Sequence, residues 1–108
     1  MLPTVTTSNT TLTDGTAQTL ADVTDNKYFT FKLDTGLMQS GDTVVLKVYD
    51  MVLGAGTLRI VQQETYTDAQ TIPIKFLPPM WVTQEIKITL QRTAGTDRNY
   101  AWVLLEND

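Results

Sequence analysis

The segment Ile86-Lys-Ile-Thr-Leu90 alternates apolar and polar side chains with a strict period of two. Such alternation is typical of a β-strand that turns one face to a core and the other to solvent. The same period recurs in four other segments, at residues 28–33, 44–49, 58–61 and 72–76. In a sixth segment, Tyr100–Leu105, both alternating sets are apolar, which predicts a strand that is buried on both faces.

Short turn signals separate these segments, for example Asp14-Gly15, Ser40-Gly-Asp42 and Ala94-Gly-Thr-Asp97. Threonine, a β-branched residue that favours strands, makes up 20 of the 108 residues. We therefore expect an all-β protein of seven or eight strands, arranged as a single antiparallel β-sandwich of jelly-roll type. A small closed β-barrel is the alternative. The sandwich domain is expected at residues 16–108, after an N-terminal arm at residues 1–15 in which residues 4–7 form a further strand.

The apolar set of each alternating segment predicts the core. We expect the following residues there: Phe29, Phe31, Leu46, Val48, Ile60, Ile74, Ile86, Ile88, Leu90 and Trp102. Pro73 should lie on an edge strand or at a strand start, because proline has no N–H to donate to a ladder. The pair Pro78-Pro79 predicts a loop.

Composition excludes several classes of function. The chain has no cysteine and no histidine, so thiolate metal sites, cysteine nucleophiles and histidine general bases are absent. Eight Lys and Arg against twelve Asp and Glu give a net charge of −4. Because nucleic acids and anionic membranes are bound mainly through basic side chains, we expect neither as a partner. We also expect no cofactor, no metal, no small-molecule substrate and no catalytic residue.

Two further features concern localisation. The start, Met1-Leu-Pro-Thr-Val-Thr-Thr7, has neither the basic region nor the apolar run of a signal peptide. The longest apolar runs, such as Val44-Val-Leu46, are far shorter than a membrane span. The expectation is a protein without a signal peptide or a transmembrane segment.

The motif Asp34-Thr-Gly36 resembles the active-site loop of retroviral-type aspartic proteases, in which two carboxylates from two subunits activate water. Here Leu37 follows the motif, where that family has alanine or serine, and Lys32 precedes it, where the family is apolar. The simpler interpretation is an aspartate that closes a strand and accepts a hydrogen bond from its own turn. A protease of this type is therefore a remote alternative.

Two other sets of side chains suggest ligand binding. Asp22 and Asp25 are the closest pair of aspartates, where a calcium ion would be sought, although nothing nearby in the sequence completes a coordination shell. Tyr49 and Tyr66 lie on mixed faces from which aromatic rings can stack on sugars. Turn capping explains most of the aspartates, and the two tyrosines are not clustered.

Two segments are candidates for contact with a partner protein. Five consecutive apolar residues cannot all reach one core, and tryptophan and methionine are enriched at interfaces. The predicted interface residues are Leu77, Pro78, Pro79, Met80 and Trp81 in the expected loop, and Leu2, Pro3 and Val5 in the expected arm. The alternative for the loop is that it folds Trp81 back over one end of the chain's own barrel. An arm that orders on binding can wrap a large surface, and prolines stiffen a loop in advance.

Three segments carry a family resemblance: Thr19-Leu-Ala-Asp-Val-Thr24, Ser40-Gly-Asp-Thr-Val-Val-Leu-Lys-Val-Tyr49 and Gln91-Arg-Thr-Ala-Gly-Thr-Asp-Arg-Asn-Tyr-Ala-Trp102. Together with residues 66–70 and 74–79, they resemble short β-rich proteins encoded among the virion genes of tailed bacteriophages. The resemblance runs from about residue 16 to the end and consists of turn and strand patterns. It implies a non-enzymatic virion structural protein, most plausibly a capsid decoration (cement) protein.

The implied partner is the major capsid protein, and the implied location is the virion, assembled in the host cytoplasm. We also expect a homo-oligomer, because a symmetric assembly lets each unit reach several capsid subunits. A receptor- or carbohydrate-binding domain of a phage fibre is the alternative function, although the chain has no shaft repeat.

Overall fold

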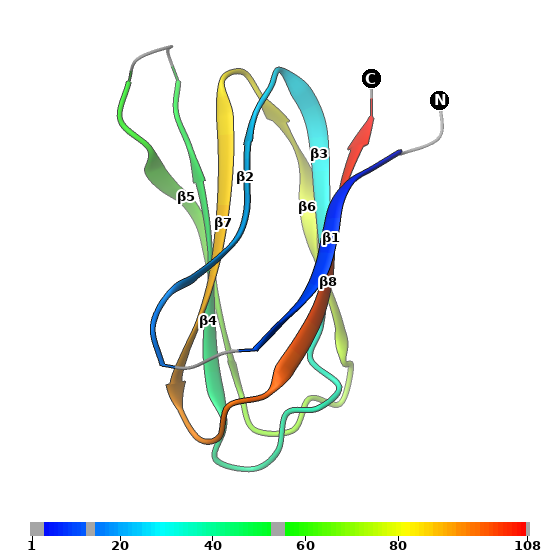
Figure 1. Ribbon diagram of the computed structural model, residues 1–108, viewed down its shortest axis with the longest axis vertical. Helices are drawn as coiled ribbons and strands as arrows, with labels where there is room; N and C mark the ends of the chain where they lie inside the picture. The colour runs from blue at the N-terminus through cyan, green and yellow to red at the C-terminus, as the bar shows by residue number, and fades with distance from the viewer. Residues whose placement is uncertain (1–3, 13–14, 53–55, 108) are drawn as a thin grey trace.

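The computed structural model of the chain describes residues 4–12, 15–52 and 56–107, and within these ranges it contains eight β-strands and no helix (Figure 1). The strands are β1 (Thr4–Leu12), β2 (Gln18–Thr24), β3 (Lys27–Asp34), β4 (Thr43–Asp50), β5 (Arg59–Thr67), β6 (Ile74–Val82), β7 (Glu85–Ala94) and β8 (Asn99–Asn107). The alternating segments of the sequence thus form strands, as their period predicts.

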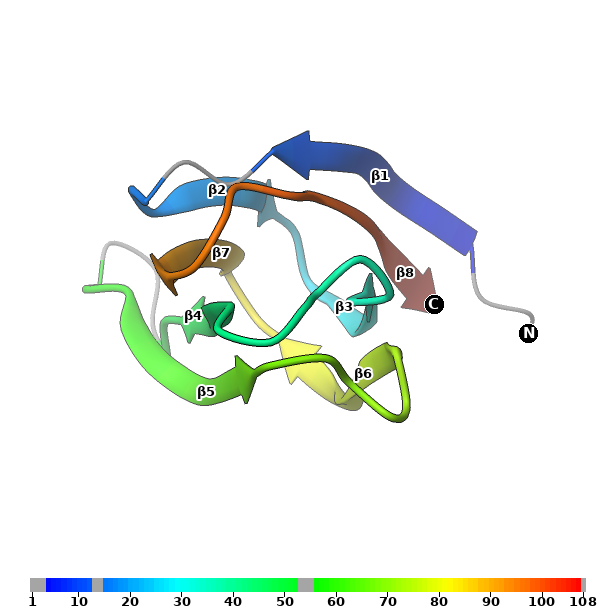
Figure 2. The ribbon, with the colours of Figure 1, turned by 90° about the horizontal axis from the view of Figure 1, so that it is seen from below.

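The strands form two antiparallel sheets of four, which pack face to face (Figure 2). Sheet A has the order β1-β8-β3-β6 and sheet B the order β2-β7-β4-β5. Strands β1 and β8, β3 and β6, β2 and β7, and β4 and β5 are paired, so the chain resembles one long hairpin folded over into two layers. This order confirms a β-sandwich of jelly-roll topology, and the free edges of both sheets exclude a closed barrel.

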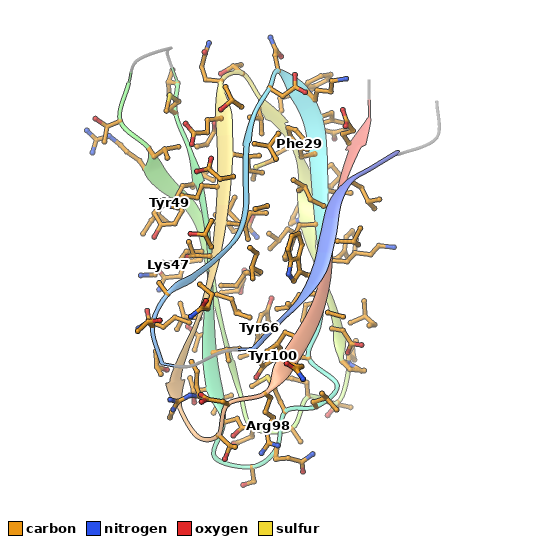
Figure 3. All side chains as sticks on the ribbon, viewed as in Figure 1. Phe29, Lys47, Tyr49, Tyr66, Arg98 and Tyr100 are labelled. Carbon is orange, nitrogen blue, oxygen red and sulfur yellow. The ribbon has the colours of Figure 1, made fainter. Side chains whose placement is uncertain are left out.

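The core lies between the two sheets. Phe29 and Phe31 of β3 face Leu46 of β4 and Ile88 of β7, and each of these side chains is almost completely buried. Figure 3 shows Phe29 pointing into the space between the layers. The predicted core is confirmed for Phe29, Phe31, Leu46, Val48, Ile86, Ile88, Leu90 and Trp102.

Two predicted core residues are wrong, Ile60 and Ile74, which are 49% and 52% exposed. In β5 the register shifts between the pairs Val48–Gln62 and Tyr49–Ile60, so that Val61 is an extra residue. This β-bulge interrupts the alternation and places Ile60 opposite the outward-facing Tyr49. Ile74 follows the expected alternation in β6, but its set of residues faces away from the core.

The structure also corrects two predicted segments. The strand expected at residues 4–7 is confirmed but is longer, since Thr4–Leu12 form β1, which pairs with β8 along its whole length. This part of the expected arm is therefore an edge strand of sheet A. The expected loop Leu77–Trp81 lies inside β6, the other edge of the sheet. The outer side of an edge strand has no ladder to join, so prolines are tolerated there. Pro73 directly precedes β6, as predicted.

Candidate interaction face

The outer face of sheet A is built around β3, whose residues alternate between core and surface. Phe31 and Leu33 point into the core, so Lys32 and Asp34 point outward, and both are exposed. Residues directly opposite on neighbouring strands share a face. Lys32 pairs with Phe76 of β6 on one side and Val103 of β8 on the other, and Asp34 pairs with Ile74. The surroundings of Lys32 on this face are therefore apolar.

The apolar residues of this surface come from both neighbours of β3. The apolar face, as we define it, consists of Ile74, Phe76 and Trp81 of β6 and Ala101, Val103 and Leu105 of β8. Phe76 and Trp81 are 64% and 70% exposed. Aromatic side chains of this size bury about 150–250 Å² each when covered, so these two leave roughly 200–300 Å² of surface uncovered. This area is at or below that of the largest apolar patch on a typical monomer, a patch that is often functional.

The prediction that β8 is buried on both faces is wrong within the single chain. Trp102 and Leu104 are buried, whereas Ala101 is exposed and Val103 and Leu105 are half-buried. The doubly apolar pattern of β8 and the apolar set at residues 72–76 are the sequence signals of this face. The sequence does not show which face of a strand points inward, so burial in the core explains both patterns equally well.

An aromatic pair marks one end of the apolar face. Trp81 lies directly opposite Tyr28 in the β3–β6 register, and the two rings stack with centroids 4.6 Å apart and planes at 26°. The stack fixes the indole ring against the sheet, yet most of its surface stays accessible. An aromatic ring that is already ordered loses little conformational entropy when a partner covers it.

The edge of sheet A beside this face is blocked against further strand pairing. Between the pairs Phe29–Met80 and Phe31–Leu77 the register shifts, and Pro78 and Pro79 occupy the bulge. The Thr30 hydroxyl donates a hydrogen bond of 2.9 Å to the Leu77 carbonyl at this point. Prolines and bulges are the features by which edge strands avoid adding another strand. A partner therefore has access to the outer face rather than to the β6 edge.

The outer face of sheet B is different in character. It presents Lys47, Tyr49, Glu85 and Lys87 together with the exposed Ile60 and Val61 of β5, so charged, aromatic and aliphatic side chains are mixed on it. Lys87 Nζ lies 5.9 Å from the centre of the Tyr49 ring, and Figure 3 shows Lys47 and Tyr49 projecting away from the core. The two outer faces differ in their exposed aromatic residues, since Phe76 and Trp81, each more than 60% exposed, both lie on sheet A.

A shallow groove of about 270 Å³ lies on the outer face of sheet A near the end of β3. It is lined by Lys32, Leu33, Asp34, Ile74, Ala101, Trp102 and Val103. The groove combines apolar walls with one cation and one anion. It can accept an apolar side chain that is flanked by groups of opposite charge.

The predicted interface residues fall into three groups. Trp81 lies on the apolar face, and the exposed Pro78 and Pro79 lie at its edge. Leu77 is buried in the core and Met80 packs against it, so these two belong to the interior. The register places Val5 of β1 opposite Leu105 of β8, whereas Leu2 and Pro3 lie outside the described residues.

Asp34 has the role of a turn residue. Its Oδ1 accepts a hydrogen bond of 2.8 Å from the Gly36 N–H. The hydroxyl of the fully buried Thr35 donates to the Pro73 carbonyl at 2.6 Å, which joins the start of the β3–β4 loop to the start of β6. The Asp-Thr-Gly motif thus closes β3 and holds the two loops together.

The aspartates considered for calcium make other contacts. Asp25 Oδ1 accepts the N–H of Asn26 at 2.7 Å. Asp22 lies beside Glu85 on sheet B, and the hydrogen bond with the Asp22 carboxyl raises the pKa of Glu85. Within the described ranges no three acidic, histidine or cysteine residues gather into a group that could hold a metal ion.

Tyr66 is part of the packing between the sheets. Its ring is half-buried against the core, and burial, followed by the charge of Glu64, raises its pKa. Lys75 Nζ, reaching across from β6, lies 5.3 Å from the centre of the ring. The ring is therefore partly covered on the side where β5 and β6 approach each other.

The loops at the lower end of the sandwich meet at Asp42, a residue that the sequence did not single out. Its side chain is 2% exposed and accepts hydrogen bonds from the N–H groups of Gln39 (2.9 Å) and Thr96 (3.0 Å) and from the Arg98 Nε. Figure 3 shows Arg98 at this end. The Arg98 contact, aided by the two N–H groups, holds the pKa of Asp42 at about 2 despite burial. These bonds join the β3–β4 and β7–β8 loops.

None of the described residues forms a helix that could cross a membrane. No protein-family model matches the chain, and comparison with curated proteins and with solved structures found no match.

Proposed function

We propose that this protein is a non-enzymatic structural protein of a tailed-bacteriophage virion, acting as a capsid decoration protein. Its partner is the major capsid protein, and its location is the virion after assembly in the host cytoplasm. The resemblance of its turn and strand segments to short virion proteins supports the class of function. The exposed Phe76 and Trp81 of the apolar face of sheet A carry the proposal, because aromatic side chains are enriched in protein–protein contacts.

The physical role follows from burial of that surface. A shell under strain from packed DNA separates at the joints between subunits, and a small rigid protein that spans a joint opposes the separation. Each 100 Å² of apolar surface removed from water contributes about 2.5 kcal/mol before the costs of association. The stacked Trp81 is suited to this contact, since buried tryptophans commonly dominate the energy of an interface.

A co-sedimentation experiment tests this proposal. Purified capsid shells of the phage that encodes the chain are incubated with the wild-type protein, with Trp81→Ala and with Tyr49→Ala. Tyr49 is the matched control, because it is an aromatic residue on the outer face of sheet B. We expect the wild type and the control to bind equally, and Trp81→Ala to bind at least about tenfold more weakly.

The results have distinct meanings. If the wild type does not sediment with the shells, the proposed function is wrong. If Trp81→Ala binds as tightly as the wild type, the apolar face is not the contact with the shell. Circular dichroism of each variant verifies that the sandwich is intact.

A glycan-binding domain of a phage fibre is the second candidate. The exposed, stacked pair of Trp81 and Tyr28 favours it, since an aromatic ring with one free face can cover the apolar side of a sugar ring. Binding of the wild type to a glycan array, lost in Trp81→Ala, would support this candidate in place of the decoration role.

A further inference from the structure

We infer that Lys32 determines which surface can cover the apolar face, because that surface has to place a carboxylate against the Lys32 ammonium group. The partner segment carries an aspartate or a glutamate beside an apolar side chain, and the apolar side chain enters the groove next to Lys32. The inference rests on the proposed function, in which this segment belongs to the major capsid protein.

Lys32 lies in the middle of the apolar face. It is directly opposite Phe76 of β6 on one side and Val103 of β8 on the other. Phe76 is 64% exposed and Val103 is half-buried, so a partner that covers both side chains covers Lys32 as well. The ammonium group then passes from water into apolar surroundings. Such a transfer is strongly unfavourable for a charge without a counter-ion.

The described part of the chain supplies no counter-ion to Lys32. Among the ion pairs of the described residues, none involves this lysine. Of the outward-facing residues of β3, β6 and β8, only Lys32 and Asp34 are charged. Asp34 follows about 6.6 Å further along the strand, and its Oδ1 accepts the N–H of Gly36 in the turn. The anion for Lys32 therefore comes from the partner.

The groove beside Lys32 defines what accompanies the anion. Its volume is about 270 Å³, and Ile74, Ala101 and Val103 form its apolar walls next to Lys32. An apolar side chain that enters the groove brings its own segment close enough for a neighbouring carboxylate to reach the ammonium group. An acidic residue beside an apolar residue is thus the partner chemistry that fits both the lysine and the groove.

A charge in this position acts on specificity more than on affinity. The loss of hydration of Lys32 offsets much of its attraction to the partner's carboxylate, so the correct partner gains little net free energy from the pair. A surface that is apolar throughout leaves the ammonium group buried and unpaired, and it is rejected for that reason. Lys32 therefore opposes non-specific apolar contacts with the exposed Phe76 beside it.

Co-sedimentation with the capsid shells, over a range of protein concentrations, tests the inference. Lys32→Met removes the charge but keeps a long unbranched side chain. This variant should bind at least about tenfold more weakly than the wild type, because the partner's carboxylate is left buried without a cation. Lys32→Arg keeps the charge and should bind within about threefold of the wild type.

Two further variants serve as controls. Lys47→Met makes the same change on the outer face of sheet B. Asp34→Asn removes the other charge of the apolar face but keeps an oxygen that can accept the Gly36 N–H. Both variants should bind as the wild type does. Circular dichroism establishes that each variant is folded.

Carbodiimide coupling of the bound wild type is the second measurement. The reagent joins an amine to a carboxyl group that lies in contact with it, so it distinguishes a carboxylate partner from a neutral acceptor. Mass spectrometry of the coupled particles should find Lys32 joined to an aspartate or a glutamate of the major capsid protein. Lys47 should show no such link.

The inference is overturned if Lys32→Met binds as tightly as the wild type or more tightly, which is the result for a partner without a carboxylate. It is also overturned if Lys32 couples to no carboxyl group of the capsid protein. Either result, with a wild type that binds the shells, contradicts the inference alone. A wild type that does not sediment with the shells contradicts the proposed function, and the inference with it.

Discussion

Arg98 donates its Nε hydrogen to the carboxylate of Asp42, which lies immediately before β4 and is almost completely buried. The same carboxylate accepts the N–H groups of Gln39 and Thr96. One side chain therefore satisfies donors from two loops that are more than fifty residues apart in the sequence. The loops at this end of the sandwich depend on that carboxylate for their arrangement.

Asp42→Ala should destabilise the fold by about 3 kcal/mol, because it removes the buried acceptor that the N–H groups of Gln39 and Thr96 and the Arg98 Nε share. Urea denaturation monitored by circular dichroism measures the loss. Asp97→Ala is the matched control, since its salt bridge to Arg92 is 44% exposed on the aspartate side and should contribute at most about 1 kcal/mol. Equal losses in the two variants would contradict the central role of Asp42.

Acid should weaken the fold through the same residue. The pKa of Asp42 is about 2 in the folded chain, below the usual value of 3.8. A carboxyl whose pKa is lowered by folding stabilises the fold fully above its unfolded pKa. That stability is lost as the pH falls from about 4 to about 2. The free energy of unfolding of the wild type should therefore fall more steeply over this range than that of Asp42→Asn. Parallel pH curves for the two proteins would contradict the assignment.

Gly95 should tolerate no side chain, since a Cβ there would lie 2.2 Å from Asp42 Oδ1 and 2.6 Å from Asp42 Cα. Gly41 has almost the same φ, +92° against +90°, but a Cβ there would meet nothing within 4 Å. Gly41→Ala should therefore cost about 1–2 kcal/mol for its backbone conformation alone. Gly95→Ala should cost clearly more, as measured by thermal unfolding. A similar loss of stability in both variants would show that the loop containing Asp42 can shift at little cost to make room for the new Cβ.

Substitutions of two isoleucines distinguish a core position from a position on the apolar face. Ile88→Ala should cost about 2–5 kcal/mol, because its side chain is completely buried between the sheets. Ile74→Ala should change the stability of the monomer by less than about 0.5 kcal/mol, since Ile74 is 52% exposed. Chemical denaturation of the wild type and both variants provides the comparison. A large loss for Ile74→Ala would contradict its placement on the outer face.

The strands could be predicted from the sequence because apolar and polar residues alternate regularly in the strands that supply most of the core. In β3, β4 and β7 the apolar set points inward without interruption, and Phe31, Leu46 and Ile88 were placed correctly in the core. Where a bulge interrupts a strand, the alternation predicts the wrong face for the residues beyond it. The extra residue Val61 has this effect on Ile60. A bulge is not visible in a hydrophobic pattern.

The candidate site was harder to predict, for a different physical reason. An apolar set in a strand indicates that a face is covered, but the sequence does not say whether the cover is the chain's own second sheet or a partner. Trp81, an interface candidate from the sequence, is exposed, but it lies in a strand rather than in the expected loop. Asp42 was missed because its partners belong to two distant loops, which only the strand order brings together.

The central proposal, that this chain is a component of a tailed-phage virion, is tested most directly by quantitative mass spectrometry of particles purified from cells that produce the chain. The account predicts that the protein is present in a fixed, high ratio to the major capsid protein and remains with the particles through density-gradient purification. Its absence from purified particles, while it is abundant in the infected cell, would contradict the account.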